Sequence, residues 1–181
     1  MKPCSRTLRH LGLAAAGVAA LTILGCSGGS GSSSTAPRLG YTNPVTSGYQ
    51  LVADPSSTAT HLVLNLVGPA GSQLQGGTFS LTTEAAKATW SPSVAEGGAL
   101  DLGSGLKLMK SKAEGSAMQV AIYQKGASPA VLATKPLFTV ALDLKAGVKG
   151  PIALAASPAK ILDAQGNTVT VPVAVGTLTA E

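Results

Sequence analysis

Hydrophobic and polar residues alternate one by one along much of the chain after residue 48. The pattern is clearest in residues 60–67. Leu62, Leu64 and Leu66 share one face of an extended chain, and the other face carries His61, Val63, Asn65 and Val67. A period of two is typical of a β-strand with one buried face. We therefore predict a half-buried strand in this segment.

Similar short runs follow between turn signals, and no segment of useful length has the period of an amphipathic helix. A hairpin is expected through Glu114-Gly115-Ser116, and residues 84–87 have room for one helical turn. Pro172 cannot donate a ladder hydrogen bond, so its strand should lie at a sheet edge or contain a bulge there. Eight to ten short strands separated by turns predict an all-β fold, an antiparallel β-sandwich. The expected strands are 49–53, 60–67, 78–82, 88–91, 106–109, 117–123, 137–145, 152–156, 160–164 and 168–175.

The first 25 residues have a different pattern, that of a secretory signal peptide. Lys2, Arg6 and Arg9 precede an uncharged hydrophobic run over residues 11–24. As a helix this run would span roughly 21 Å, which is short of the ~30 Å hydrocarbon core of a bilayer. A permanent transmembrane helix is therefore disfavoured.

The run ends in Ile23-Leu24-Gly25-Cys26, which resembles the lipobox of bacterial lipoproteins. The resemblance implies attachment of diacylglycerol to Cys26, cleavage before it and acylation of the new amino group. Ser27 follows where retention at the inner membrane would require Asp, so the resemblance implies an outer-membrane protein in a Gram-negative cell, in either leaflet. The alternative is an ordinary signal peptide in which Cys26 is incidental.

The residues after Cys26 predict a tether and one folded domain. Residues 27–37 are Gly- and Ser-rich and behave as a flexible coil, so 26–39 form the lipidated Cys and linker and 40–181 the domain. The chain has 2 Cys, Cys4 and Cys26, so the folded part contains no disulfide. Its stability must come from a hydrophobic core, which a domain of this length can build.

Composition removes one class of partner. The chain has 181 residues, 45% of them hydrophobic, and a formal net charge of +5. Three of its 13 Lys and Arg residues precede Cys26. The rest of the chain therefore has 10 basic and 8 acidic residues, a net charge of about +2. This balance does not indicate a nucleic-acid partner.

The sequence contains no local catalytic constellation. His61 is the one histidine after Cys26, and we interpret it as a strand residue on the less buried face. Residues 25–29 fit G-x-S-x-G, but a nucleophile elbow needs a strand-turn-helix context that a flexible tether does not provide. The acidic residues do not cluster as D-x-D or E-x-x-E, so paired-carboxylate hydrolysis has no local support. The sequence predicts no cofactor and no enzymatic activity.

Two polar groups have both a binding and a structural interpretation. Asp163 and Asn167 flank Gly166 and could coordinate Ca²⁺, but D-x-x-G-N is first a tight-turn sequence. Lys107, Lys110 and Lys112 form a basic cluster that could face anionic headgroups or acidic polysaccharide, although a solvated hairpin is the simpler interpretation.

The arrangement of several segments resembles that of cohesin domains, which are jelly-roll sandwiches related in fold to bacterial carbohydrate-binding modules. The resemblance covers roughly residues 49–179 and implies a jelly-roll fold and recognition of a partner on a sheet face. No dockerin-like segment occurs in this chain, so dockerin binding is not carried over. The segments that carry the resemblance are GTFSLT at 77–82, KATW at 87–90, PLFTVALDL at 136–144, ILDAQGN at 161–167 and GTLT at 176–179.

Few aromatic residues are available as ligand contacts. Sugar-binding modules commonly stack pyranose rings on coplanar aromatics. Here Trp90 and Tyr123 are the candidate contacts, and Tyr41 and Tyr49 are the other aromatics not assigned to the core. Trp90 is also a candidate core residue. We expect a lipid-anchored, non-enzymatic protein whose β-sandwich recognises another protein, with a carbohydrate-binding module for cell-surface polysaccharide as the alternative.

Overall fold

The computed structural model describes residues 38–103, 108–126 and 128–181, and in these residues it contains sixteen strands and no helix. The hydrophobic run, Cys26 and Lys107 lie outside the described residues. The strands are β1 (Leu39–Thr42), β2 (Tyr49–Ala53), β3 (His61–Val67), β4 (Gln73–Thr83), β5 (Ala88–Trp90), β6 (Ala95–Glu96), β7 (Met109–Glu114), β8 (Ala117–Tyr123), β9 (Ala130–Val131), β10 (Phe138–Leu144), β11 (Gly150–Ile152), β12 (Leu154–Ala156), β13 (Ala159–Asp163), β14 (Thr168–Val171), β15 (Val173–Ala174) and β16 (Thr177–Ala180).

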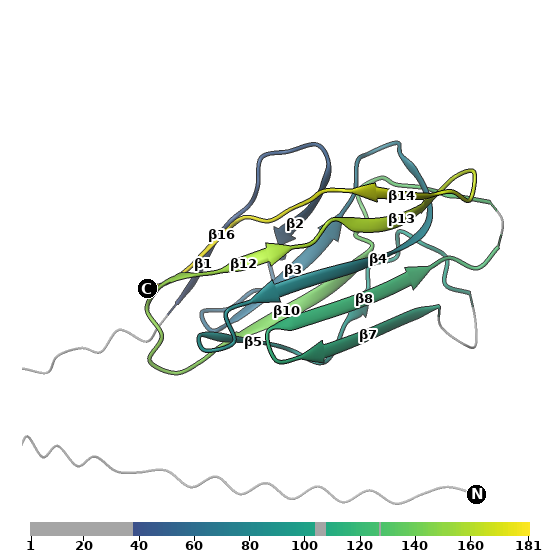
Figure 1. Cartoon of the computed structure of the whole chain (residues 1–181). Coiled ribbons are helices and arrows are strands. Elements are labelled where there is room, and N and C mark those ends of the chain that lie inside the picture. The colour runs from purple at the N-terminus through teal and green to yellow at the C-terminus, as the bar shows by residue number, and fades with distance from the viewer. Residues whose placement is uncertain (1–37, 104–107, 127) are drawn as a thin grey trace, which may run out of the picture. The chain divides into compact units, whose positions relative to one another are not determined.

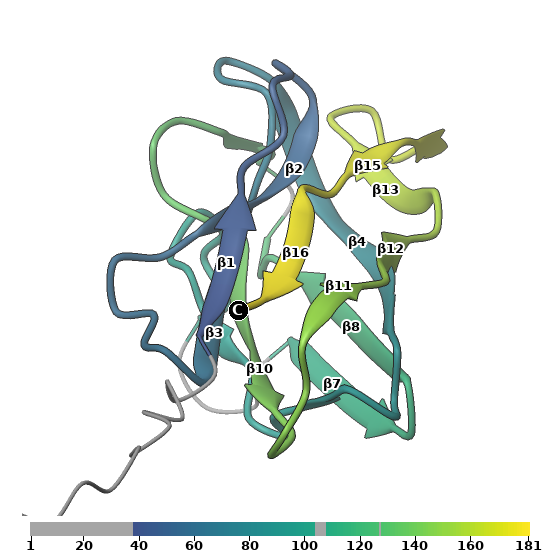
Figure 2. The ribbon, with the colours of Figure 1, turned by 90° about the vertical axis from the view of Figure 1, so that its left-hand side faces the viewer.

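Two large sheets face each other, as Figure 1 shows. One has the order β15-β2-β3-β10-β5, with β6 also paired to β10. The other has the order β14-β13-β4-β8-β7, with β9 and β12 also paired to β4. A small sheet, β1-β16-β11, joins the first and last strands of the domain (Figure 2). The prediction of an all-β antiparallel sandwich is confirmed, with a single parallel pair between β15 and β2.

The core lies between the two large sheets and follows the period of two. The three leucines of β3, Leu62, Leu64 and Leu66, are at most 3% exposed. From the opposite sheet Phe79 meets Phe138 edge to face, with 5.3 Å between ring centroids. On β8 the alternating residues Met118, Val120 and Ile122 are also buried. Alternation therefore predicted which side chains form the core.

Several predicted strand limits were wrong. Of the strand expected at 106–109, residues 106 and 107 lie outside the described residues, and the strand described there is Met109–Glu114. The long run 168–175 is broken at Pro172. Before this proline β14 is the edge of one sheet, and after it β15 is the edge of the other. Because β14 is an edge strand, Val169 is 40% exposed although its alternation predicts a buried side chain. The edge position predicted for Pro172 is confirmed.

The hairpin and turn predictions are confirmed. β7 and β8 are joined by Gly115 and Ser116, with Glu114 opposite Ala117. Gly115 has a φ of 54°, a left-handed conformation that glycine adopts without a steric penalty. Residues 84–87 form a single turn in which the Lys87 and Ala88 amides donate to the Glu84 carbonyl.

Candidate functional site

The outer face of the seven-stranded sheet is built by the side chains that alternate with the core. On β4, Thr78 and Ser80 point outward because Phe79 and Leu81 are buried. On β8, Gln119 and Ala121 are outward in the same way. The polar half of each strand pattern therefore forms one continuous surface.

Strand register brings distant lysines onto this surface. Lys160 of β13 is opposite Thr78 of β4, Thr78 is opposite Ala121 of β8, and Ala121 is opposite Lys110 of β7. In the neighbouring row Ser80, Gln119 and Lys112 are aligned. The small side chains are thus central, and the lysines stand on the strands to either side.

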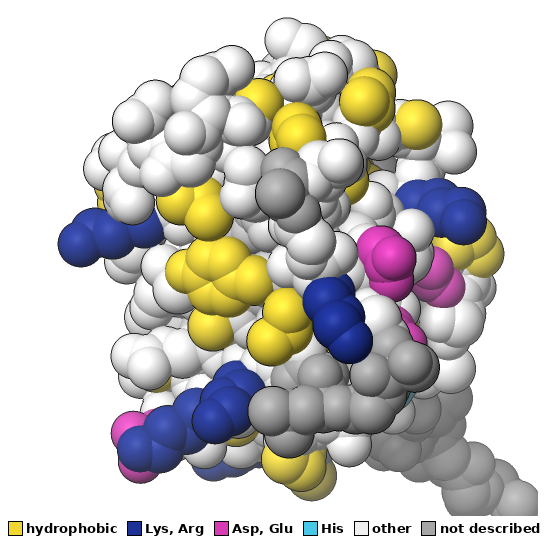
Figure 3. All heavy atoms as spheres, turned by 90° about the vertical axis from the view of Figure 1, so that its right-hand side faces the viewer, with side chains coloured by type: hydrophobic (Ala, Val, Ile, Leu, Met, Phe, Trp, Pro, Cys, Tyr) yellow, Lys and Arg dark blue, Asp and Glu magenta, His cyan; other side chains and the backbone are white. Residues whose placement is uncertain are grey.

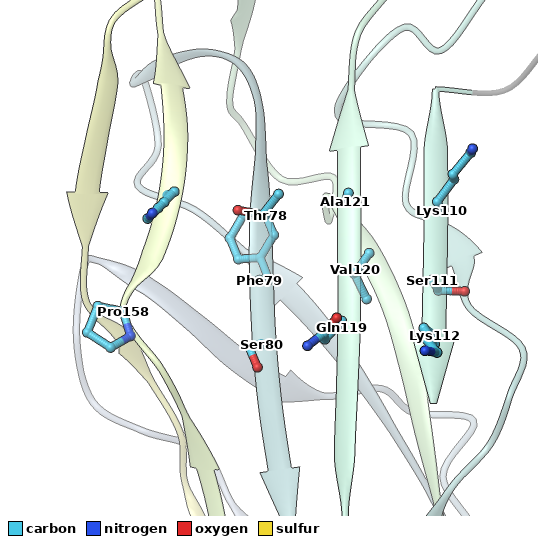
Figure 4. A pocket seen from close by; sticks show the side chains of 11 residues that line it. Thr78, Phe79, Ser80, Lys110, Ser111, Lys112, Gln119, Val120, Ala121 and Pro158 are labelled. Atoms are coloured by element: carbon cyan, nitrogen blue, oxygen red, sulfur yellow. The ribbon is translucent and has the colours of Figure 1, made fainter. Parts of the chain in front are cut away.

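These residues line an open hollow of about 620 Å³. Figure 4 shows Thr78, Ser80, Gln119 and Ala121 on its floor, with Lys110 and Lys112 along one side. Among the described residues no carboxylate lines the hollow. The lining residues are Thr78, Phe79, Ser80, Lys110, Ser111, Lys112, Gln119, Val120, Ala121, Pro158 and Lys160.

With the exception of Lys112, the polar side chains of this hollow have no partner among the described residues. Lys112 forms an ion pair with Glu114 at 2.7 Å. In the described part of the chain, Lys110 and Lys160 have no ionic partner, and the side chains of Thr78, Ser80 and Gln119 make no hydrogen bond. Their donors and acceptors are therefore available to an incoming molecule.

Two exposed apolar side chains lie beyond the residues that line the hollow. Tyr123 of β8 is 37% exposed and lies opposite Gly76 of β4, and its amide donates to the carbonyl of Leu108, which is 39% exposed. A Cβ on Gly76 would come 2.3 Å from Cδ1 of Tyr123, so the ring lies against this glycine. Figure 3 shows hydrophobic side chains gathered at this end of the sandwich, with Lys and Arg beside them. Tyr123, a candidate contact from the sequence, lies beside the hollow.

Trp90, the other candidate contact, lies in the core. It is 5% exposed, and its indole N–H donates to the carbonyl of Ser116 at 3.0 Å. Tyr49 is 6% exposed, and the Tyr41 hydroxyl is bonded to Leu51 and Gly176. Trp90 as a ligand contact was therefore wrong, and the described aromatics do not form a coplanar sugar platform.

The outer face of the six-stranded sheet is different because its polar groups bond to one another. Thr139 donates to Asn65 at 2.7 Å, and Asn65 donates to Asp54 at 2.7 Å. The Ser56 hydroxyl and amide, then Asn65, lower the pKa of Asp54 by stabilising its charged form. Thr139, Asn65 and Asp54 therefore already have partners on this face.

His61 lies on that same face. Its Nδ1 is 2.6 Å from Asp143 Oδ1, and the two residues are directly opposite in β3 and β10. In the described residues no serine hydroxyl bonds to either side chain, and neither residue lines the hollow. His61 is a strand residue paired with an aspartate, and the structure does not assemble a triad around it.

Asp163 is the last residue of β13, and its side chain holds the turn that follows. Its Oδ1 accepts from the amides of Gln165 and Asn167 at 2.9 and 2.8 Å, and Gly166 has a φ of 82°. Among the described residues no three His, Cys, Asp or Glu side chains are grouped to hold a metal ion. Nor does that part of the chain include a helix long and apolar enough to cross a membrane.

Sequence reasoning found only part of this site. Lys110 and Lys112 were visible as a basic cluster, whereas Lys160, Thr78, Ser80 and Gln119 were not selected. Alternation indicated that these side chains face outward, but only register shows that they are neighbours.

Comparison with known proteins identifies the fold. No protein-family model matches the chain. No curated protein matches it either. Solved cohesin structures do match over most of its length.

The sixth cohesin of scaffoldin B from Acetivibrio cellulolyticus, solved in complex with a Cel5 dockerin, has a TM-score of 0.56 and 15% identity over 72% of this chain and 95% of that chain. CaCohA2 from Clostridium acetobutylicum has a TM-score of 0.57 and 11% identity, covering 72% and 88%. A non-cellulosomal cohesin from the archaeon Archaeoglobus fulgidus has a TM-score of 0.54 and 16% identity, covering 72% and 87%. At these identities the similarity shows the fold, and the cohesin-like β-sandwich expected from the sequence is confirmed.

Proposed function

We propose that this chain is a non-enzymatic lipoprotein whose cohesin-like β-sandwich recognises another protein through the outer face of the seven-stranded sheet. One of the similar structures is a cohesin in complex with a dockerin, which supports a protein partner for a sandwich of this shape. Which protein this chain binds does not follow from that similarity. The choice of face rests on this chain's own residues.

The observation that carries the proposal is the contrast between the two outer faces. On the six-stranded sheet the polar side chains bond to one another, from Thr139 through Asn65 to Asp54. On the seven-stranded sheet Thr78, Ser80 and Gln119 make no side-chain hydrogen bond within the described residues, and Lys110 and Lys160 have no ionic partner there, so only Lys112 is paired. An interface needs unsatisfied donors and acceptors, because each direct bond to the partner then replaces only a bond to water.

The membrane attachment is the second part of the proposal and rests on the lipobox resemblance at Cys26. One acyl chain binds a bilayer marginally, whereas two or three hold a protein durably. Residues 27–37 would then serve as the spacer between lipid and domain. We place the protein at the cell envelope, anchored to either leaflet of the outer membrane.

Mass spectrometry of the protein purified from membranes tests the anchor. We expect a mature chain that begins at Cys26 and carries a diacylglyceryl group and an amide-linked acyl chain. The Cys26→Ser variant should lack this mass and leave the membrane fraction. An unmodified Cys26 thiol in protein free in the medium would contradict the anchor.

A substitution on the floor of the hollow tests the recognition face. Ala121→Tyr fills the floor with an uncharged ring, and Tyr is favourable in a strand. Thr89→Tyr is the matched control, because Thr89 is exposed on β5 of the other sheet. In pull-downs from envelopes of the producing organism, a partner captured by the unaltered protein should be lost with Ala121→Tyr and retained with Thr89→Tyr. Equal capture by both variants would contradict this face, and binding of glycans but no protein on arrays would favour the carbohydrate alternative.

A further inference from the structure

We infer that the partner segment received by this hollow is an acidic polypeptide with carboxylates on both of its flanks, an inference that rests on the proposed function. It specifies the chemistry of the partner, which neither the fold nor the structural comparisons address. Its basis is the position and pairing of three lysines.

The positive charges stand on opposite sides of the hollow. Lys160 is on β13 and Lys110 on β7, and register places them in one row with Thr78 and Ala121 between them. Three inter-strand steps separate β13 from β7, which corresponds to about 14 Å at ~4.8 Å per step. A segment lying along β4 and β8 would therefore have an ammonium group on each side.

These charges are not balanced within the sandwich. Glu114 pairs with Lys112 at 2.7 Å, and the described residues that line the hollow include no carboxylate. Lys110 and Lys160 therefore keep their charge exposed to whatever covers the face. Covering an ammonium group with an uncharged surface removes its water without replacing it, which is unfavourable, whereas a carboxylate restores the interaction. Acidic segments are thus selected and basic ones are repelled.

The floor favours a polypeptide over an acidic polysaccharide. Between the lysines lie Thr78, Ser80, Gln119 and Ala121, which offer hydroxyl and amide groups suited to peptide N–H and C=O groups. No aromatic ring lies outward on this floor, since the Phe79 ring is 2% exposed and points into the core. Tyr123 lies beside the hollow, two residues after Ala121 on β8, and offers one apolar contact there. This floor therefore offers no aromatic surface on which successive sugar rings could stack.

Fluorescence anisotropy with labelled poly-L-glutamate tests the inference on the full-length protein in detergent. We expect saturable binding that weakens as salt is raised. The double substitution Lys110→Glu and Lys160→Glu should weaken binding by at least about tenfold, because it places like charges opposite the probe. The matched control is Lys145→Glu with Lys149→Glu, which changes the net charge equally at two exposed lysines outside the hollow and should change affinity less than about twofold.

Labelled polygalacturonate, an acidic polysaccharide, is the competing probe. Equal weakening by both double substitutions would show general charge attraction and overturn the inference. Tighter binding of polygalacturonate than of poly-L-glutamate, or no binding of poly-L-glutamate, would overturn it as well. Thermal unfolding of each variant checks folding, and the neutral pair Lys110→Gln and Lys160→Gln should give an intermediate loss.

The two proposals fail in distinguishable ways. If Ala121→Tyr abolishes capture of the envelope partner while Lys110→Glu with Lys160→Glu does not, the face is correct and the acidic partner is wrong. If neither variant affects capture, the proposed face fails too.

Discussion

Trp90 shows how the surroundings of one side chain decide its role. A tryptophan in an alternating segment serves equally as a core residue or as a ligand platform, because both positions occur on a strand. Its 5% exposure and the bond from its indole N–H to Ser116 place it in the core. This bond also ties β5 to the turn between β7 and β8.

We therefore expect Trp90→Ala to lower the free energy of unfolding by about 3–5 kcal/mol, since a large buried ring is removed. Trp90→Phe should cost much less, because it keeps a ring and loses the indole bond. Urea unfolding followed by circular dichroism measures both. A Trp90→Ala variant as stable as the unaltered protein would contradict the core position.

For Tyr123 the sequence predicted the direction of the side chain but not its neighbours. Alternation placed Tyr123 outward, and it is 37% exposed. It did not show that Gly76 of β4 lies beneath the ring, because the pairing of Gly76 with Tyr123 joins residues 47 positions apart in the sequence.

In the β7–β8 hairpin the sequence predicted the turn and the limits of β8 correctly, but not the limits of β7. A two-residue connection between alternating strands fixes the register of both, so Lys110 and Lys112 lie on the same face as Gln119 and Ala121. Gly115 permits this connection through its φ of 54°.

Replacing this glycine tests the hairpin. Nothing lies within 4 Å of a Cβ built on Gly115, so the cost of Gly115→Ala is backbone strain alone. We expect it to lower the free energy of unfolding by about 1 kcal/mol. Gly115→Asn should cost less, since Asn tolerates left-handed conformations. Urea unfolding followed by Trp90 fluorescence distinguishes the two, and equal stability of all three proteins would contradict the turn geometry.

For the strand run around Pro172, the sequence predicted an edge position but not the sheet to which each half belongs. The proline predicted an edge or a bulge, and both β14 and β15 are edges. That the chain changes sheets at this residue depends on β15 pairing in parallel with β2, more than 120 positions earlier in the sequence.

At the scale of the whole molecule, the Tyr41 hydroxyl links distant parts of the sandwich. It donates to the Leu51 carbonyl at 3.0 Å and accepts from the Gly176 amide at 2.7 Å. It therefore connects β1, β2 and the segment before β16. Burial raises the pKa of Tyr41, although the Gly176 amide partly opposes this by stabilising the charged form.

The raised pKa predicts a loss of stability in alkali. A group whose pKa is higher in the folded state contributes stability fully below its unfolded pKa, near 10, and loses it as pH rises through the folded pKa. Tyr41→Phe should cost on the order of 1 kcal/mol at neutral pH, because two hydrogen bonds are lost. It should also weaken the decline above about pH 10 without removing it, since burial raises the pKa of Tyr49 too. Unfolding midpoints measured from pH 7 to 11 test this, and parallel curves for both proteins would contradict it.

The sequence by itself determined the fold class, the buried face of most strands, the β7–β8 hairpin and the absence of cysteines after Cys26. These properties depend on periodicity and on residues close together in the chain. Only the tertiary structure decided that Trp90 is internal, that Pro172 separates two sheets, and that Lys160 faces Lys110 across Thr78 and Ala121. The reason is physical: alternation determines on which side of a strand a residue lies, whereas its neighbours depend on which distant strands pair and in which register.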